Sequence, residues 1–135
     1  MRGIETALKV KKREFLEEER KLKELLLQLE ELKVKELETQ KRVELLKKLK
    51  VNTTLEFAFL KETVSTLLKT LERIREEINT LSEKLEKQKE KVALKRGEIK
   101  AIEKFIEKKK AEKKKREELL LERFVHEVFS SRFND

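Results

Sequence analysis

Residues 57–106 read FAFLKETVSTLLKTLERIREEINTLSEKLEKQKEKVALKRGEIKAIEKFI, and this stretch decides the fold. Its apolar side chains return at alternating steps of three and four residues, interrupted only by Gln88 and Lys95. A repeat of 3.5 residues keeps one seam of a helix facing a partner helix, so the stretch predicts a left-handed coiled coil. The frame consists of Phe57, Leu60, Val64, Leu67, Leu71, Ile74, Ile78, Leu81, Leu85, Gln88, Val92, Lys95, Ile99, Ile102 and Ile106.

A weaker frame of the same period precedes it and supplies the partner helix. Between the two frames, residues 50–54 are poor in helix formers, and Thr53 with Glu56 forms a capping-box pattern that starts a new helix. So short a link brings the second helix back antiparallel to the first. The first frame consists of Ile4, Leu8, Lys11, Phe15, Glu18, Leu22, Leu25, Leu29, Leu32, Glu36, Thr39, Val43 and Leu46.

The composition agrees with this architecture. Charged residues make up 47% of the 135 residues and hydrophobic ones 37%, which suffices for a narrow seam between helices but not for a wide core. Proline is absent and there are two glycines, so the chain has few corners. We therefore predict an all-α fold, a two-helix antiparallel coiled-coil hairpin with a longer second helix. One domain spans 1–135, with helix one at about 4–50, the tip at 51–53 and helix two at about 54–130.

The tightest hairpin predicts a register in which no layer buries two charges. A register slipped by one heptad, with a longer tip loop, also satisfies this test, so the first is favoured on loop length alone. The expected pairs include Leu46 with Phe57, Leu29 with Ile74, Ile4 with Ile99, Glu36 with Leu67, Glu18 with Leu85, Phe15 with Gln88, Lys11 with Val92 and Leu8 with Lys95.

Helix two is expected to outrun its partner by about 30 residues at 1.5 Å each. Residues 104–116 hold eight basic side chains against Glu107 and Glu112, with Lys109, Lys113 and Arg116 on the seam. They are interpreted as a solvated helix surface or as a site for an acidic protein. A nucleic-acid site is the least favoured alternative, because Phe105 is the lone aromatic residue there. An apolar stripe follows, which predicts a partner-binding surface, with self-association or a frayed tail as alternatives. It comprises Leu119, Leu120, Leu121, Phe124, Val125, Val128, Phe129 and Phe133.

Nothing in the sequence indicates catalysis. His126 is the only histidine, Asp135 is the only aspartate, and cysteine is absent. Glutamates on a convex, wet coiled-coil surface do not have the environment that tunes an acid or a base. We expect no enzyme activity, cofactor or metal. No membrane span or signal peptide is visible, which indicates a cytoplasmic protein.

Several segments resemble the FliJ family of the bacterial flagellar type III export apparatus. Residues 4–14 resemble the leucine-plus-basic entry of that family, and Phe59-Leu60 its aromatic-aliphatic start of helix two. Residues 98–109, EIKAIEKFIEKK, resemble its late alanine-leucine-glutamate-lysine-leucine element. Residues 123–133 resemble its tail, except that His126-Glu127 replaces the usual acidic pair.

The resemblance implies a non-enzymatic stalk-like protein. Residues 1–15 and 100–130 would enter the hexameric export ATPase ring, as the central stalk of a rotary ATPase does. The tip, with Phe57, Phe59, Leu45 and Leu49, would face the export gate membrane protein or export chaperones. The protein would lie peripherally on the cytoplasmic face of the inner membrane at the flagellar base. The alternatives are a stalk protein of a virulence-type secretion system and a generic coiled-coil protein, such as a tether, a chaperone hairpin or another ATPase stalk.

Overall fold

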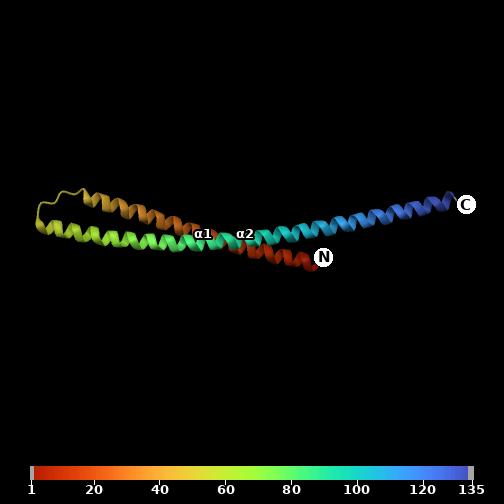
Figure 1. Cartoon of the computed structure of the whole chain (residues 1–135), viewed down its shortest axis with the longest axis horizontal. Coiled ribbons are helices and arrows are strands. Elements are labelled where there is room, and N and C mark those ends of the chain that lie inside the picture. The colour runs from red at the N-terminus through yellow and green to blue at the C-terminus, as the bar shows by residue number, and fades with distance from the viewer. Residues whose placement is uncertain (1, 134–135) are drawn as a thin grey trace. The chain divides into compact units, whose positions relative to one another are not determined.

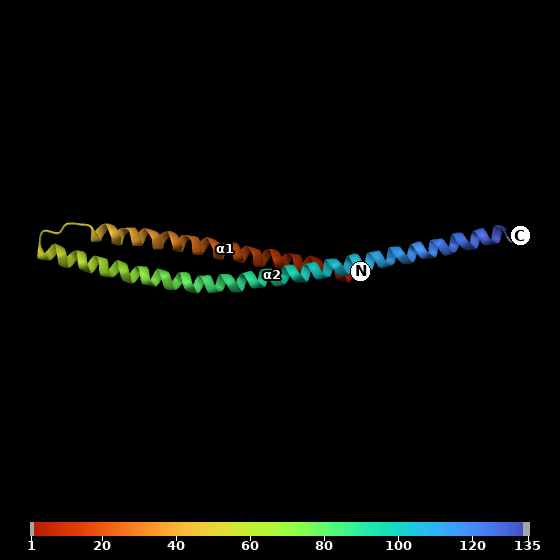
Figure 2. The ribbon, with the colours of Figure 1, turned by 45° about the horizontal axis from the view of Figure 1, so that its top comes forward.

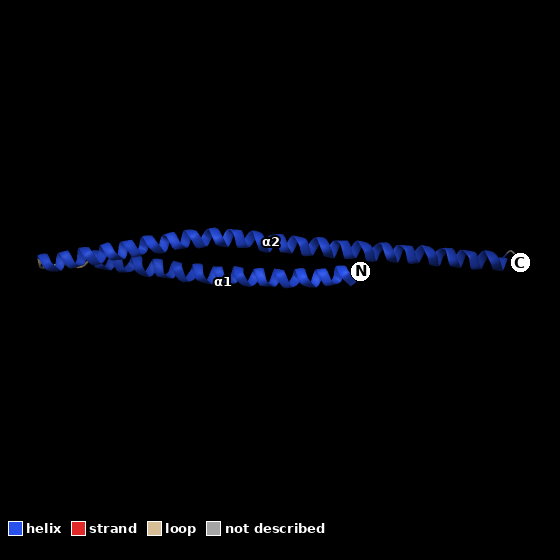
Figure 3. Cartoon of the chain, turned by 90° about the horizontal axis from the view of Figure 1, so that it is seen from below, coloured by secondary structure: helices blue, strands red, loops and turns tan. Residues whose placement is uncertain are grey.

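The computed structural model describes residues 2–133 and consists of two helices. Helix α1 spans Arg2–Lys47 and helix α2 spans Thr54–Phe133, of 46 and 80 residues. No strand occurs in the described chain, and the helices pack against each other (Figure 3). The predicted all-α hairpin with a longer second helix is confirmed. Helix α1 ends three residues before the expected position, while α2 begins at the predicted residue.

Local hydrogen bonds fix the two helix ends at the tip. The Thr53 hydroxyl accepts the Glu56 amide at 3.1 Å, and the Glu56 carboxylate accepts the Asn52 amide at 3.1 Å. This reciprocal pair corresponds to the predicted capping box, except that the Glu56 carboxylate reaches the amide of Asn52, one residue before Thr53. The Thr53 hydroxyl satisfies one of the amides that the first turn of a helix leaves free. At the end of α1, the amides of Lys48 and Leu49 each donate at 3.2 Å to a carbonyl three residues back. The tighter turn closes α1.

The chain forms two compact units. The tip unit is Leu16–Ala93, in which α1 and α2 run side by side in opposite directions and join through the loop (Figures 1 and 2). The tail unit combines Met1–Phe15 with Leu94–Asp135, of which residues 2–15 and 94–133 are described. Here the first turns of α1 lie against the part of α2 that ends near Ile106. The single domain expected from the sequence stays a prediction.

The core is a seam along the predicted frames. Every frame position is buried or half-buried except Phe57, which is 58% exposed. No large side chain among the described residues is completely enclosed, because two helices cover a seam from two directions only. The most buried residues are Leu29, Val43, Leu71, Leu85, Gln88, Val92 and Ile106.

The favoured register is wrong by about one heptad in the tip unit, and the slipped alternative is wrong as well, because it moves the helices in the opposite direction. The Arg75 Nε atom lies 3.9 Å from the Glu36 carboxylate, a position that the prediction gave to Leu67. Phe57, predicted to face Leu46, is exposed because the first turns of α2 extend beyond the end of α1 (Figure 1). The linker is therefore an extended segment and not the tightest possible turn.

The tail unit shows the same offset. The Lys11 Nζ atom, predicted to face Val92, lies 3.0 Å from the Glu98 carboxylate. Ile106 is 9% exposed, although the predicted register leaves it beyond the end of helix one. Sliding α1 by seven residues along α2 brings its first turns over Ile106 and keeps the heptad alternation intact.

Polar groups on the seam find polar partners in this register. In the tip unit, the Gln88 amide donates at 2.9 Å to the Glu18 carbonyl and also to its carboxylate, which lowers the pKa of Glu18. In the tail unit, the Lys95 ammonium donates to the Glu14 carboxylate at 2.6 Å. This bond lowers the pKa of Glu14 and raises that of Lys95. Pairing of half-buried polar groups avoids the cost of leaving them unsatisfied, so it favours the observed register.

Candidate protein-docking surfaces

The part of α2 beyond Ile106 has no covering helix. Every side chain described from residue 107 to 129 is exposed. The first turns of α1, which begins at Arg2, lie over the seam as far as Ile106. Within this segment we define the apolar tail face as Leu120, Leu121, Phe124, Val125, Val128 and Phe129. Leu119 lies on another side of the helix, beside Lys115 and Arg116.

The apolar tail face carries the six apolar residues predicted to bind a partner. Leu121, Val125 and Phe129 are spaced by four residues and line one side of the helix, with a shallow groove of about 370 Å³. Leu120 and Phe124 lie beside them and are as exposed, while Val128 is 39% exposed. The structure thus brings these six residues together on one segment. The side chain of Phe133, and Asp135, lie outside the described residues.

The basic stretch, residues 104–116, lies on the same segment and is exposed apart from Ile106. The Lys109 Nζ atom lies 3.7 Å from the Glu112 carboxylate and 5.5 Å from the centroid of the Phe105 ring. Lys113 and Arg116 point from the same uncovered helix. The predicted basic site is therefore a solvent-facing helix surface that precedes the apolar tail face.

The tip unit holds a second apolar surface around Phe57 and Phe59. A groove of about 560 Å³ opens between the end of α1, the linker and the start of α2. It includes Leu55, which the sequence analysis did not single out. The groove is lined by Leu46, Leu49, Lys50, Val51, Leu55, Glu56, Phe59, Leu60 and Thr63.

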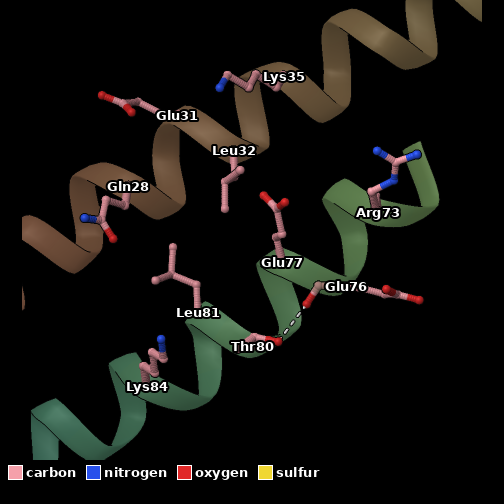
Figure 4. Close-up of a pocket in the computed structure, with 10 residues that line it drawn as sticks. All are labelled: Gln28, Glu31, Leu32, Lys35, Arg73, Glu76, Glu77, Thr80, Leu81 and Lys84. Carbon is pink, nitrogen blue, oxygen red and sulfur yellow. Dashed lines mark hydrogen bonds between the residues drawn. The ribbon is translucent and has the colours of Figure 1, made fainter. Parts of the chain in front are cut away.

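A third depression lies on the flank of the tip unit. Figure 4 shows Leu32 of α1 and Leu81 of α2 pointing toward each other at its base, with charged side chains around the rim. Its volume is about 530 Å³, and the Thr80 hydroxyl donates to the Glu76 carbonyl at 3.1 Å. The rim carboxylates of Glu31, Glu76 and Glu77 are exposed to water. Among residues 2–133, no cluster of three His, Cys, Asp or Glu side chains could hold a metal ion.

Comparisons of the chain with protein-family models, curated protein sequences and solved structures give no match. In the described part of the chain, neither helix contains an apolar stretch long enough to cross a bilayer. The apolar tail face, the basic stretch and the apolar tip are thus the features from which a function is inferred.

Proposed function

We propose that the protein is a non-enzymatic coiled-coil adaptor that binds a partner protein through its apolar tail face. The observation that supports this proposal most strongly is the group of six exposed apolar side chains on one face of a helix segment without a covering helix. Moving one large apolar side chain from water into an apolar contact stabilises a complex by up to about 1.5–3 kcal/mol. These side chains are exposed in the free protein, so a partner that covers them gains part of this free energy for each. An amphipathic helix of this kind binds in the apolar groove of another protein.

The basic stretch favours a partner with an acidic surface. Its eight basic side chains lie next to the apolar tail face along α2, so one partner can contact both. Charges around an apolar contact speed association and fix orientation more than they add affinity. We therefore expect the rate of association to fall at high salt, while the complex, once formed, depends mainly on the apolar contact.

The resemblance to the FliJ family specifies the partner within this proposal. The protein would be a component of the bacterial flagellar type III export apparatus, with its tail unit in the hexameric ring of the export ATPase. The tip unit would contact the export gate membrane protein and export chaperones. This role requires no nucleic acid and places the protein in the cytoplasm, peripherally at the inner membrane. The support is the similarity of residues 4–14, 59–60 and 98–109 together with the exposed tail.

The test is a pull-down of the purified chain with the flagellar export ATPase, read together with ATPase activity. The variant Phe124→Asp/Val125→Asp/Val128→Asp places three charges in the apolar contact, and a chain truncated after Glu118 removes the face. Both are expected to lose binding by more than about 100-fold. In the triple variant each buried unpaired charge costs several kcal/mol, and in the truncated chain the apolar contact itself is missing. Both should also lose stimulation of the ATPase.

The matched control is Leu16→Asp/Leu27→Asp/Leu37→Asp. It introduces the same charges at three exposed apolar positions of α1 and should bind normally. Full binding by the truncated chain would reject tail docking. Tail-dependent binding to a different protein, with none to the export ATPase, would keep the adaptor proposal and reject the flagellar assignment.

A further inference from the structure

Large apolar side chains surround the tip of the hairpin on more than one side. Leu55 is 81% and Phe59 is 72% exposed, and their spacing of four residues places them on one side of α2. Phe57 lies about 200° of helix rotation from Leu55, on the other side. The groove between α1 and α2 includes Leu55 and Phe59 but not Phe57. A single helix bound in that groove would leave Phe57 in water, whereas a surface that receives the whole end would cover all three.

Lysines accompany these apolar side chains. Lys47, Lys48 and Lys50 are exposed where α1 passes into the linker. Glu56, the acidic residue nearest on α2, already accepts the Asn52 amide through its carboxylate. The tip thus presents positive charge beside exposed hydrocarbon.

We propose that the tip docks on a membrane surface that contains anionic lipid. The apolar side chains would enter the interface between headgroups and acyl chains, and the three lysines would face the headgroups. Apolar residues combined with lysine are the chemistry by which a helix lies on a bilayer without crossing it. The polar linker residues Asn52 and Thr53 would stay among the headgroups and keep the tip from passing deeper than that interface.

The charge part of the proposal predicts a measurable effect. Near a surface rich in anionic lipid, each lysine contributes about fivefold in partitioning. Lys47→Gln/Lys48→Gln/Lys50→Gln should therefore weaken sedimentation with vesicles of phosphatidylcholine and phosphatidylglycerol by about 100-fold. Vesicles of phosphatidylcholine alone should bind the unaltered protein weakly. All these side chains are exposed, so the helical content of the variant should not change.

The basic stretch supplies the matched control, because it is the competing site for anionic lipid. Lys108→Gln/Lys110→Gln/Lys114→Gln removes the same charge from exposed positions of α2. It should change binding by less than about threefold, since exposed charges beyond the Debye length of about 10 Å from a docked surface are largely screened. An equal loss in both triple variants would show diffuse attraction of a basic protein and would overturn the proposal.

A tryptophan reporter tests the apolar part. The chain has no tryptophan, so Phe59→Trp introduces a single fluorophore at the tip, and Leu27→Trp introduces one at an exposed position of α1. The emission of Phe59→Trp should shift to the blue on anionic vesicles and be quenched by lipids brominated on the acyl chain. The emission of Leu27→Trp should not change.

Two outcomes would refute lipid docking. One is an unshifted Phe59→Trp spectrum on anionic vesicles; the other is a shift caused only by an acidic amphipathic peptide, which would make the tip a protein-binding groove. The inference does not depend on the partner of the tail. Phe124→Asp/Val125→Asp/Val128→Asp should therefore bind anionic vesicles like the unaltered protein even though its tail face is disrupted.

Discussion

Truncation of Leu71 to alanine tests the narrow seam of the tip unit. Leu71 is 5% exposed, and a leucine truncated in a well-packed core costs about 2–5 kcal/mol. A two-helix seam lets neighbouring side chains and water relax into the space, so we expect a loss near the low end, about 2–3 kcal/mol. Leu68, three residues earlier in α2, is 43% exposed and undergoes the same chemical change. Leu68→Ala should cost less than about 1 kcal/mol, because roughly half of its apolar surface is already in water.

Both variants are compared by urea unfolding, followed through helical circular dichroism at several protein concentrations. The midpoint for Leu71→Ala should fall at an unchanged slope, and the midpoints should not depend on concentration. Equal losses for Leu68→Ala and Leu71→Ala would refute the assignment of the seam. A midpoint that rises with concentration would show that the seam forms between chains and not within one.

Three further predictions concern the cap, the glycine of α2 and the carboxylates of Glu14 and Glu18 at the seam. Thr53→Ala should lower the free energy of unfolding by about 1 kcal/mol because it removes the cap of α2; no change in the urea midpoint would exclude a stabilising cap. Gly97→Ala should raise the free energy of unfolding by up to about 1 kcal/mol, and with it the thermal midpoint, since a Cβ there meets nothing within 4 Å. Destabilisation would mean that the position is covered. The carboxylates of Glu14 and Glu18 have pKa values below the ordinary 4.5, so their contribution is present above pH 4.5 and is lost as the pH falls through the lowered values. The thermal midpoint should thus drop on acidification, and less steeply in Glu14→Gln/Glu18→Gln; identical pH profiles would contradict this.

The heptad frame made most of the fold predictable. An apolar repeat over residues 57–106 fixes which side of each helix is covered, and all of its positions except Phe57 are at least half-buried. The capping box located the start of α2 to the residue, because a threonine followed three residues later by a glutamate is a pattern typical of the first turn of a helix. Periodicity and capping act over short stretches of chain, so the sequence shows them directly.

The register was not predictable from the same pattern. A slip of seven residues returns every apolar position to the seam, so the frame cannot distinguish one register from the next. The prediction relied on the shortest loop and on apolar partners for polar residues. In the structure, Lys95 reaches Glu14, Gln88 reaches Glu18, and Glu36 lies near Arg75. Searching for partners among the polar residues themselves would have found the offset.

The docking surfaces were predictable to different degrees. The apolar tail face follows from the unequal lengths of the helices, and it would be exposed in either register. The apolar tip depends on where α1 ends and on the exposed turns of α2, so Leu55 and the groove beside it were missed. Lys47, Lys48 and Lys50 were visible in the sequence, but only the structure places them next to that hydrocarbon.

Hydrogen exchange of the free protein tests the central claim most directly, namely that the tail of α2 has no covering helix. A lone helix opens at a cost near zero, whereas amides of a packed seam exchange only through larger openings. Amides of residues 110–130 should therefore exchange orders of magnitude faster than those of residues 64–92. Protection of residues 119–129 equal to that of residues 64–92 in the monomer would contradict it, because some other part of the chain would then cover the apolar tail face.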